Sequence, residues 1–189
     1  MTAELLRQTL DALGLDRVRA VGGSIGNLWV LRLAQAHPAR VERLVLLGAG
    51  PLTSDTGVPP FIRLLRTPLG KLITVVPENR RMLGRQLGAL GHATGGDAGQ
   101  IPKAFIDWRL GRHGYLPGLV LTNAEIAGIE QPTLMVYGTA DPIGSIASWR
   151  RFTGRLPQGE LEVVEGGGHL VWYSDPGRVG ARVAQYLTG

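Results

Sequence analysis

The chain has 189 residues and an apolar fraction of 44%, enough for one domain plus an insertion. It carries 20 Lys or Arg, 15 Asp or Glu and no Cys, which excludes a disulfide framework, thiolate chemistry and a Cys-based zinc site. The net charge of +5 is scattered, with Arg80-Arg81 and Arg150-Arg151 as the densest pairs. No nucleic-acid-reading motif accompanies these residues, so we expect no nucleic-acid partner.

The N-terminal segment MTAELLRQTLDALG is amphipathic and contains Glu4 and Asp11. It lacks the basic start and apolar centre of a signal peptide. No apolar run reaches the ~18 residues that a membrane span needs. These features predict a cytoplasmic protein with no membrane contact.

The first fifty residues alternate between helix and strand patterns. Leucines at helical spacing predict a helix that ends at Gly14. Short apolar runs at 18–21 and 44–47 predict buried strands, and the second is continuous, as in a parallel strand covered on both faces. The helical period over 25–36 ends before Pro38, since the residue preceding a proline avoids the helical region.

From Pro51 onward, prolines and glycines become frequent. Segments 60–75 and 79–90 have helical character, and 91–100 is glycine-rich. We therefore expect residues 51–128 to form an inserted helical module.

The initial pattern resumes after the insertion. We expect a strand at 133–137, a helix over 144–156, a polar edge strand at 161–165 and a last helix over 176–187. This alternation predicts an α/β fold, with a parallel sheet of about four strands and crossover helices. The core would consist of residues 1–50 and 129–189, with 51–128 inserted between them.

One glycine-rich stretch, Gly22-Gly23-Ser24-Ile25-Gly26, matches G-x-S-x-G between a strand and a helix. Three interpretations compete: a turn without function, a phosphate cradle, and a nucleophile elbow that presents Ser24. In the elbow, Gly22 and Gly26 would let strand and helix approach closely. A dinucleotide turn would need glycine at Ser24 and an acid after the next strand, and a Walker loop would need Gly-Lys-Ser/Thr. The sequence lacks these features.

A nucleophilic serine needs a histidine and usually a carboxylate. Asp141 follows the strand at 133–137, and His169 follows a glycine loop after the last strand. Because parallel strands end at one edge of the sheet, Ser24, Asp141 and His169 are expected to converge there. We expect the other three histidines to lie at the surface: His37, His92 and His113.

The chain resembles the α/β-hydrolase superfamily in three blocks that together cover most of its length. The nucleophile region is LDALGLDRVRAVGGSIGNLWVLRLAQAHPARVERLVLLGAG, the acid loop is QPTLMVYGTADPI, and the histidine loop is LEVVEGGGHLVWYSDPGRV. The order Ser, acid, His is the one expected for that family. Residues 51–128 occupy the place of its cap.

The resemblance implies a serine hydrolase acting on a small-molecule carboxylic ester, without metal or cofactor. Ser24 would be the nucleophile, His169 the base, Asp141 its orienting acid, and Ile25 N–H an oxyanion donor. Apolar cap residues would line the acyl pocket or pack on one another: Phe61, Leu65, Phe105 and Trp108. Prolyl-iminopeptidase-like, carbon–carbon bond and perhydrolase activities use the same three residue types.

The family's sheet has eight strands, with the nucleophile after the fifth, whereas one strand pattern precedes Ser24. The resemblance therefore implies that the N-terminal strands are lacking, together with a second oxyanion donor. The strand at 18–21 would then be an unpaired edge through which two copies could associate. The alternative function is a catalytically silent fragment or an interaction module.

Overall fold

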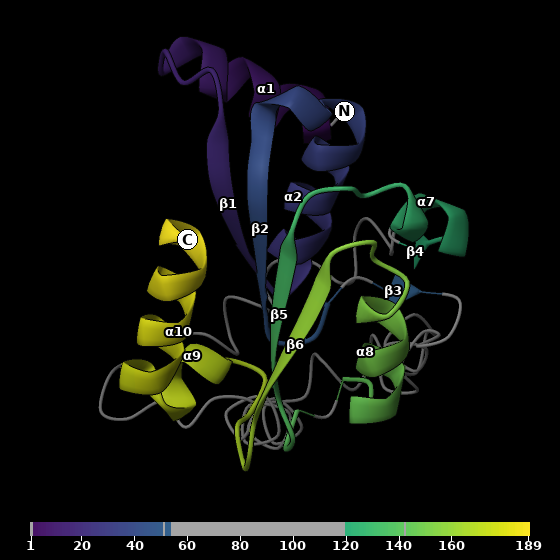
Figure 1. Ribbon diagram of the computed structural model, residues 1–189, viewed down its shortest axis with the longest axis vertical. Helices are drawn as coiled ribbons and strands as arrows, with labels where there is room; N and C mark the ends of the chain where they lie inside the picture. Colours follow the sequence, from purple (N-terminus) through teal and green to yellow (C-terminus); the bar gives the residue numbers. More distant parts are fainter. Residues whose placement is uncertain (1, 51, 54–119, 142) are drawn as a thin grey trace, which may run out of the picture.

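The computed structural model describes residues 2–50, 52–53, 120–141 and 143–189. At its centre is a parallel sheet in the order β1-β2-β5-β6 (Figure 1). These strands are β1 (Val18–Gly23), β2 (Val41–Leu47), β5 (Thr133–Gly138) and β6 (Gly159–Val164). The predicted α/β fold with a parallel sheet of about four strands is confirmed.

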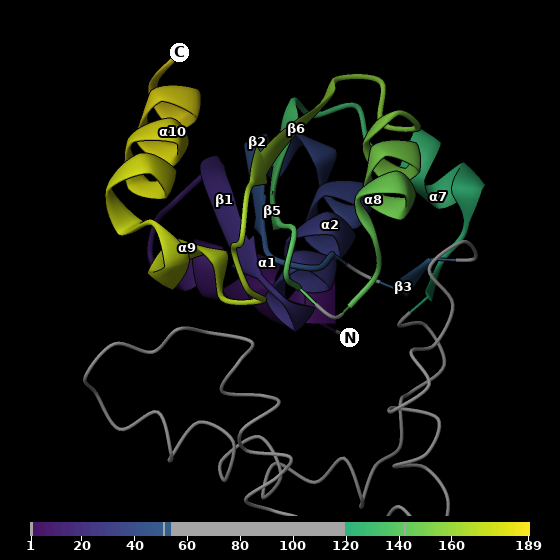
Figure 2. The same cartoon turned by 90° about the horizontal axis from the view of Figure 1, so that it is seen from below.

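Helices cover both faces of the sheet (Figure 2). One face carries α2 (Ile25–Ala36) and α8 (Ile146–Thr153), with α1 (Thr2–Ala12) packed on this cluster. The other face carries α9 (Val171–Ser174) and α10 (Pro176–Thr188). In the described part of the chain, no helix combines the length and apolar character needed to cross a bilayer.

The central strands are the most deeply buried elements. All six residues of β5 are buried, because this strand has a neighbour on each side and helices over both faces. The predicted polar strand at 161–165 corresponds to β6, which lies at one end of the described sheet as expected. The core therefore holds the carboxyl ends of β2 and β5 firmly, and Asp141 follows the end of β5.

The helix predicted over 144–156 is shorter, running from Ile146 to Thr153. Gly144 has φ +86°, outside the helical region, and Ser145 caps the helix through a reciprocal capping box with Ser148. Gly154 then ends the helix. The sequence pattern overestimated its length because these capping residues continue the polar–apolar period.

Five short elements of the described residues were not predicted: the strands β3 (Leu52–Thr53) and β4 (Val120–Leu121), which pair in parallel, the helices α7 (Asn123–Ala127) and α9, and a 3₁₀ helix at Pro38–Arg40. A capping box formed by Thr122 and Glu125 starts α7. Glu125 forms an ion pair with Arg32 of α2, and Ile126 is fully buried in the core. Thus α7, within the range assigned to the insertion, packs against the core. The helices expected at 60–75 and 79–90 lie outside the described residues.

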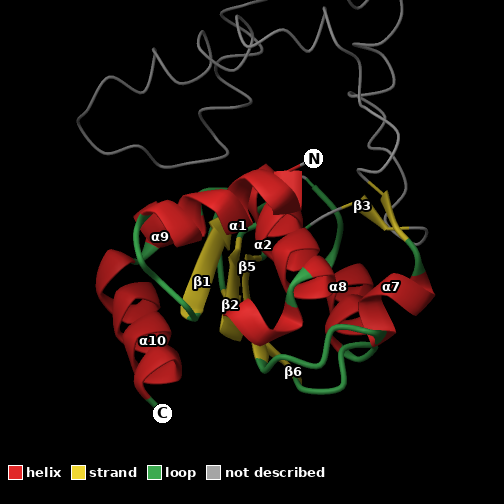
Figure 3. Cartoon of the chain, turned by 90° about the horizontal axis from the view of Figure 1, so that it is seen from above, coloured by secondary structure: helices red, strands yellow, loops and turns green. Residues whose placement is uncertain are grey.

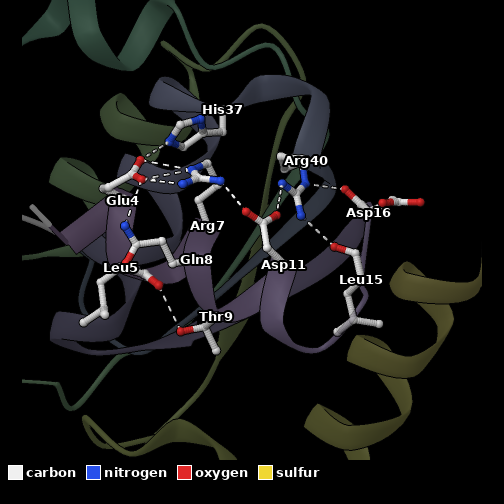
Figure 4. Close-up of polar contacts among 10 residues, drawn as sticks. All are labelled: Glu4, Leu5, Arg7, Gln8, Thr9, Asp11, Leu15, Asp16, His37 and Arg40. Carbon is white, nitrogen blue, oxygen red and sulfur yellow. Dashed lines mark hydrogen bonds and ion pairs between the residues drawn. The ribbon is translucent and has the colours of Figure 1, made fainter.

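A polar network ties α1 to the connection between α2 and β2 (Figure 4). Arg40 of the short 3₁₀ helix (Pro38–Arg40) pairs with Asp11 at 2.7 Å and donates to Leu15 O at 2.7 Å. His37 lies at the end of α2, and its Nε2 is 3.5 Å from Glu4 Oε2. These contacts fix the turn that leads from α1 into β1, and hence the start of the strand that precedes Ser24. Seen from above, α1 crosses α2 at this end of the sheet (Figure 3).

At the opposite end from β6, β1 is an outer strand of the described sheet. Val21 is 45% exposed there. Arg19, by contrast, is bonded to Glu42 at 2.8 Å and to Leu187 O, so its charge is partly neutralised. Pairing of two copies through β1 stays a prediction.

We expect the 189-residue chain to self-associate, because backbone groups of an outer strand pair readily with another strand. Val21→Lys should shift the chain toward monomer, since a charge at this position opposes pairing. Size-exclusion chromatography with light scattering measures the mass. Leu5→Lys, at an exposed position of α1, is the control. A monomeric wild-type chain would contradict this expectation.

Candidate active site

Ser24 lies in a strained turn between β1 and α2. Its φ of 53° and ψ of −121° make it the one non-glycine residue with positive φ in the described part of the chain. The turn is held by the Ser24 N–H, which donates to Leu47 O at 3.0 Å. Ser24 is the N-cap residue of α2, but its side chain makes no capping hydrogen bond. The hydroxyl is therefore available to another partner.

That partner is His169. The Ser24 Oγ lies 2.7 Å from His169 Nε2, and His169 Nδ1 lies 2.9 Å from Asp141 Oδ2. The side chain of His169 is 9% exposed and that of Asp141 is fully buried. A carboxylate accepts hydrogen bonds, so Nδ1 carries the proton and Nε2 faces the serine hydroxyl as an acceptor. The structure thus brings together the three residues selected from the sequence.

The buried carboxylate of Asp141 has further donors. Ala49 N–H donates to Oδ2 at 2.9 Å, and Ile143 N–H donates to Oδ1 at 2.8 Å. The Tyr137 hydroxyl donates to the Asp141 backbone oxygen at 3.1 Å. The two bonds to the carboxylate oxygens offset the cost of burying a charge and fix the direction in which the carboxylate points. The Tyr137 bond holds the backbone of the same loop.

Tyr137 is itself affected by this setting. Burial, and then the neighbouring charge of Asp141, raises the pKa of Tyr137 to about 12. The phenol therefore stays neutral and keeps donating to the acid loop well above pH 10.

Close approach at the turn depends on Gly22. A Cβ added to Gly22 would lie 2.8 Å from the Asn27 backbone, closer than real side chains come. At Gly26, no described atom lies within 4 Å of the same position. Among the described residues, the close packing of strand on helix thus rests on Gly22, although the sequence had assigned it to both glycines.

Two glycines that the sequence analysis did not select also shape the site. Gly48, at φ +72°, would place a Cβ 2.3 Å from His169 O, and Gly138 would place one 2.1 Å from Gly167 O. Each directly follows or ends a strand at the carboxyl edge of the sheet. A glycine at the end of a strand could have identified both positions from the sequence, because the backbone there must pass close to the histidine loop.

Ile25, the expected oxyanion donor, is the first residue of α2. The first N–H groups of a helix lack partners within it and carry its positive end, which suits a developing negative charge. The four expected pocket residues lie outside the described residues: Phe61, Leu65, Phe105 and Trp108. The described residues contain no cluster of three or more His, Asp or Glu placed to hold a metal.

Comparison with known proteins agrees with the fold. The model of the alpha/beta hydrolase family matches residues 2–182. The chain therefore belongs to the alpha/beta hydrolase family.

Two curated relatives match most of the chain. An uncharacterised protein of Mycobacterium tuberculosis is 28% identical over 200 residues, which cover 92% of this chain and 56% of that protein. The 2-hydroxy-6-oxononadienedioate/2-hydroxy-6-oxononatrienedioate hydrolase 2 of Pseudomonas putida is 27% identical over 182 residues, covering 89% of this chain and 62% of the enzyme. The chain thus spans less than two thirds of the length of these relatives.

Solved structures share the architecture. The 2-hydroxy-6-oxo-6-phenylhexa-2,4-dienoate hydrolase of Rhodococcus sp. strain RHA1 superposes with a TM-score of 0.77 at 17% identity, covering 99% of this chain and 69% of that one. The esterase RhEst1 of Rhodococcus sp. ECU1013 gives 0.72 at 19% identity, covering 100% and 71%.

We expect Gly22→Ala to lower the free energy of unfolding by about 1–3 kcal/mol, because the new methyl group meets the α2 backbone. Gly26→Ala is the matched control and should change stability by less than about 0.5 kcal/mol. Urea unfolding measures both. Equal stability of the two variants would show that the elbow does not depend on the close contact at Gly22.

A second prediction concerns alkaline pH. Folding raises the pKa of Tyr137 from 10.0 to about 12. Below pH 10 the phenol is neutral in both the folded and the unfolded chain, so its contribution to the free energy of unfolding is complete. As the pH rises from 10 toward 12, the unfolded chain ionises first, and this contribution is lost. The wild-type chain should therefore lose stability relative to Tyr137→Phe over this interval. Urea unfolding at several pH values tests the difference, and parallel curves would contradict it.

Proposed function

We propose that the chain is a serine hydrolase that cleaves carboxylic esters with Ser24, His169 and Asp141. The observation that most strongly supports this proposal is the continuous line of hydrogen bonds from Ser24 Oγ through His169 to Asp141, with lengths of 2.7 and 2.9 Å. Family membership supports hydrolysis as the reaction class.

In this proposal, the Ser24 Oγ attacks the ester carbonyl carbon while His169 Nε2 takes its proton. The imidazolium then gives that proton to the leaving alcohol, and an acyl-enzyme remains on Ser24. Water, deprotonated by the same nitrogen, attacks the acyl-enzyme, and the imidazolium returns that proton to Ser24 Oγ as the acid leaves. Asp141 holds the imidazole in its productive tautomer and stabilises its positive charge.

The oxyanion of each tetrahedral intermediate would accept a hydrogen bond from Ile25 N–H. This donor follows Ser24 directly and lies at the positive end of a 12-residue helix. The strained backbone of Ser24 supports this role, because in a nucleophile elbow the N–H of the residue after the nucleophile is one of the oxyanion donors.

The substrate and setting of the reaction follow as further parts of the proposal. A small-molecule ester would bind with its acyl group against the 51–128 module, where Phe61, Leu65, Phe105 and Trp108 are the proposed lining. No metal or cofactor takes part. We propose the cytoplasm as the setting of the reaction.

A second candidate reaction is hydrolysis of a carbon–carbon bond. It is favoured by the curated relatives, several of which are named as 2-hydroxy-6-oxononadienedioate/2-hydroxy-6-oxononatrienedioate hydrolases, at 23–27% identity. Parallel assays with p-nitrophenyl esters and with a 2-hydroxy-6-oxo-dienoate distinguish the two reactions. If the chain is an ester hydrolase, kcat/KM should be larger for the p-nitrophenyl ester than for the dienoate.

We expect Ser24→Ala to reduce p-nitrophenyl ester turnover by on the order of 10⁴-fold or more, because no other group would form the acyl-enzyme. Ser145→Ala is the matched control. That hydroxyl accepts a hydrogen bond from Ser148 N–H at the start of α8, so its loss should lower stability by about 1 kcal/mol and leave turnover intact.

The assay also tests the alternative function. Turnover that is equal in the wild-type chain and Ser24→Ala would contradict the hydrolase proposal. It would favour a catalytically silent fragment or interaction module.

A further inference from the structure

Asn27 is a fully buried polar residue three positions after Ser24 on α2. Its Nδ2 donates to Leu47 O at 3.1 Å and to Ala49 O at 3.0 Å, and its Oδ1 accepts from Leu47 N–H at 3.2 Å. These backbone partners fix which end of the amide is oxygen and which is nitrogen. The side chain therefore clamps the end of β2 to the first turn of α2.

The clamped segment lies between the nucleophile and the acid. Leu47 O also accepts from Ser24 N–H, and Ala49 N–H donates to Asp141 Oδ2, the same oxygen that faces His169. These hydrogen bonds, together with the backbone from Leu47 to Ala49, form a closed circuit through Ser24, Leu47, Ala49, Asp141 and His169. Asn27 bridges the two backbone members of that circuit.

Other side chains do not reproduce this bridge. Aspartate has nearly the same shape, but one of its oxygens would face the two carbonyl oxygens that Nδ2 now serves. Alanine would leave the carbonyl of Ala49 and the N–H of Leu47 without the side-chain partner they have now, in a buried place. A carboxamide supplies both the donors and the acceptor that the segment requires.

We propose that Asn27 is a positioning residue. It holds the segment 47–49 so that Ala49 N–H stays on Asp141, which keeps the carboxylate aligned with His169. Asn27 touches none of the reacting atoms and acts through Asp141. The activity readouts below rest on the proposed function, and the spectroscopic readout does not.

The first test is the rate at which a fluorophosphonate labels the chain. Asn27→Ala and Asn27→Asp should label about 10–100 times more slowly than the wild type, the cost of a small misplacement of catalytic groups. Gln35→Ala is the matched control, because Gln35 makes the same kind of bond from α2, to Glu125 O at 2.8 Å, away from the site. Its labelling rate should equal that of the wild type.

The second test asks whether Asn27 acts through Asp141. In an Asp141→Asn background, adding Asn27→Ala should change the labelling rate by less than about twofold, because the alignment that Asn27 maintains is already lost. Independent, multiplicative losses in the double variant would overturn the proposal. So would equal labelling of Asn27→Ala and Gln35→Ala.

The third test uses NMR and does not need a folded Asn27 variant. Coupling between two groups is reciprocal, so Asp141→Asn should shift the side-chain amide resonances of Asn27 and leave those of Gln35 unchanged. Unshifted Asn27 resonances would overturn the proposal. If the wild-type chain is not labelled but these resonances shift, the hydrolase proposal fails and the positioning role stands.

Discussion

The structure depends on one shared acceptor, the Oδ2 atom of Asp141. This fully buried oxygen receives the Ala49 N–H and faces His169 Nδ1, each at 2.9 Å. A buried carboxylate is costly unless its hydrogen bonds are satisfied, so the strand ends that supply those bonds must meet at this point. The order β1-β2-β5-β6 meets this condition, because it places Ser24, Ala49 and Asp141 after three adjacent strands.

The same geometry explains where glycine and strain occur. Gly22 lets α2 turn sharply away from β1, and Gly48 lets the end of β2 pass beneath the histidine loop. Ser24 accepts an unfavourable φ because β2 holds its N–H and the core holds α2. The energy of packing in the two helical layers thus maintains a conformation that a free peptide would avoid.

The sequence was sufficient for the four strands of the main sheet, the longer helices beside them and the three candidate residues, because strand–helix alternation and the G-x-S-x-G spacing are local signals. It did not reveal Asn27, Ala49 or Gly48, whose importance comes from contacts between residues about 20 to more than 100 positions apart along the chain. Nor did it predict α7, since a five-residue helix has too few turns to show a period. The sequence shows an Asn one turn after the serine, but not its burial or its hydrogen-bond partners.

The central claim is that Ser24 is a nucleophile served by this hydrogen-bonded circuit. A crystal structure of the chain after reaction with a fluorophosphonate tests it most directly. We expect phosphorus bonded to Ser24 Oγ and a phosphoryl oxygen within hydrogen-bond distance of Ile25 N–H, with His169 still hydrogen-bonded to Asp141. An adduct on another residue, or an unmodified Ser24 beside an intact circuit, would contradict it.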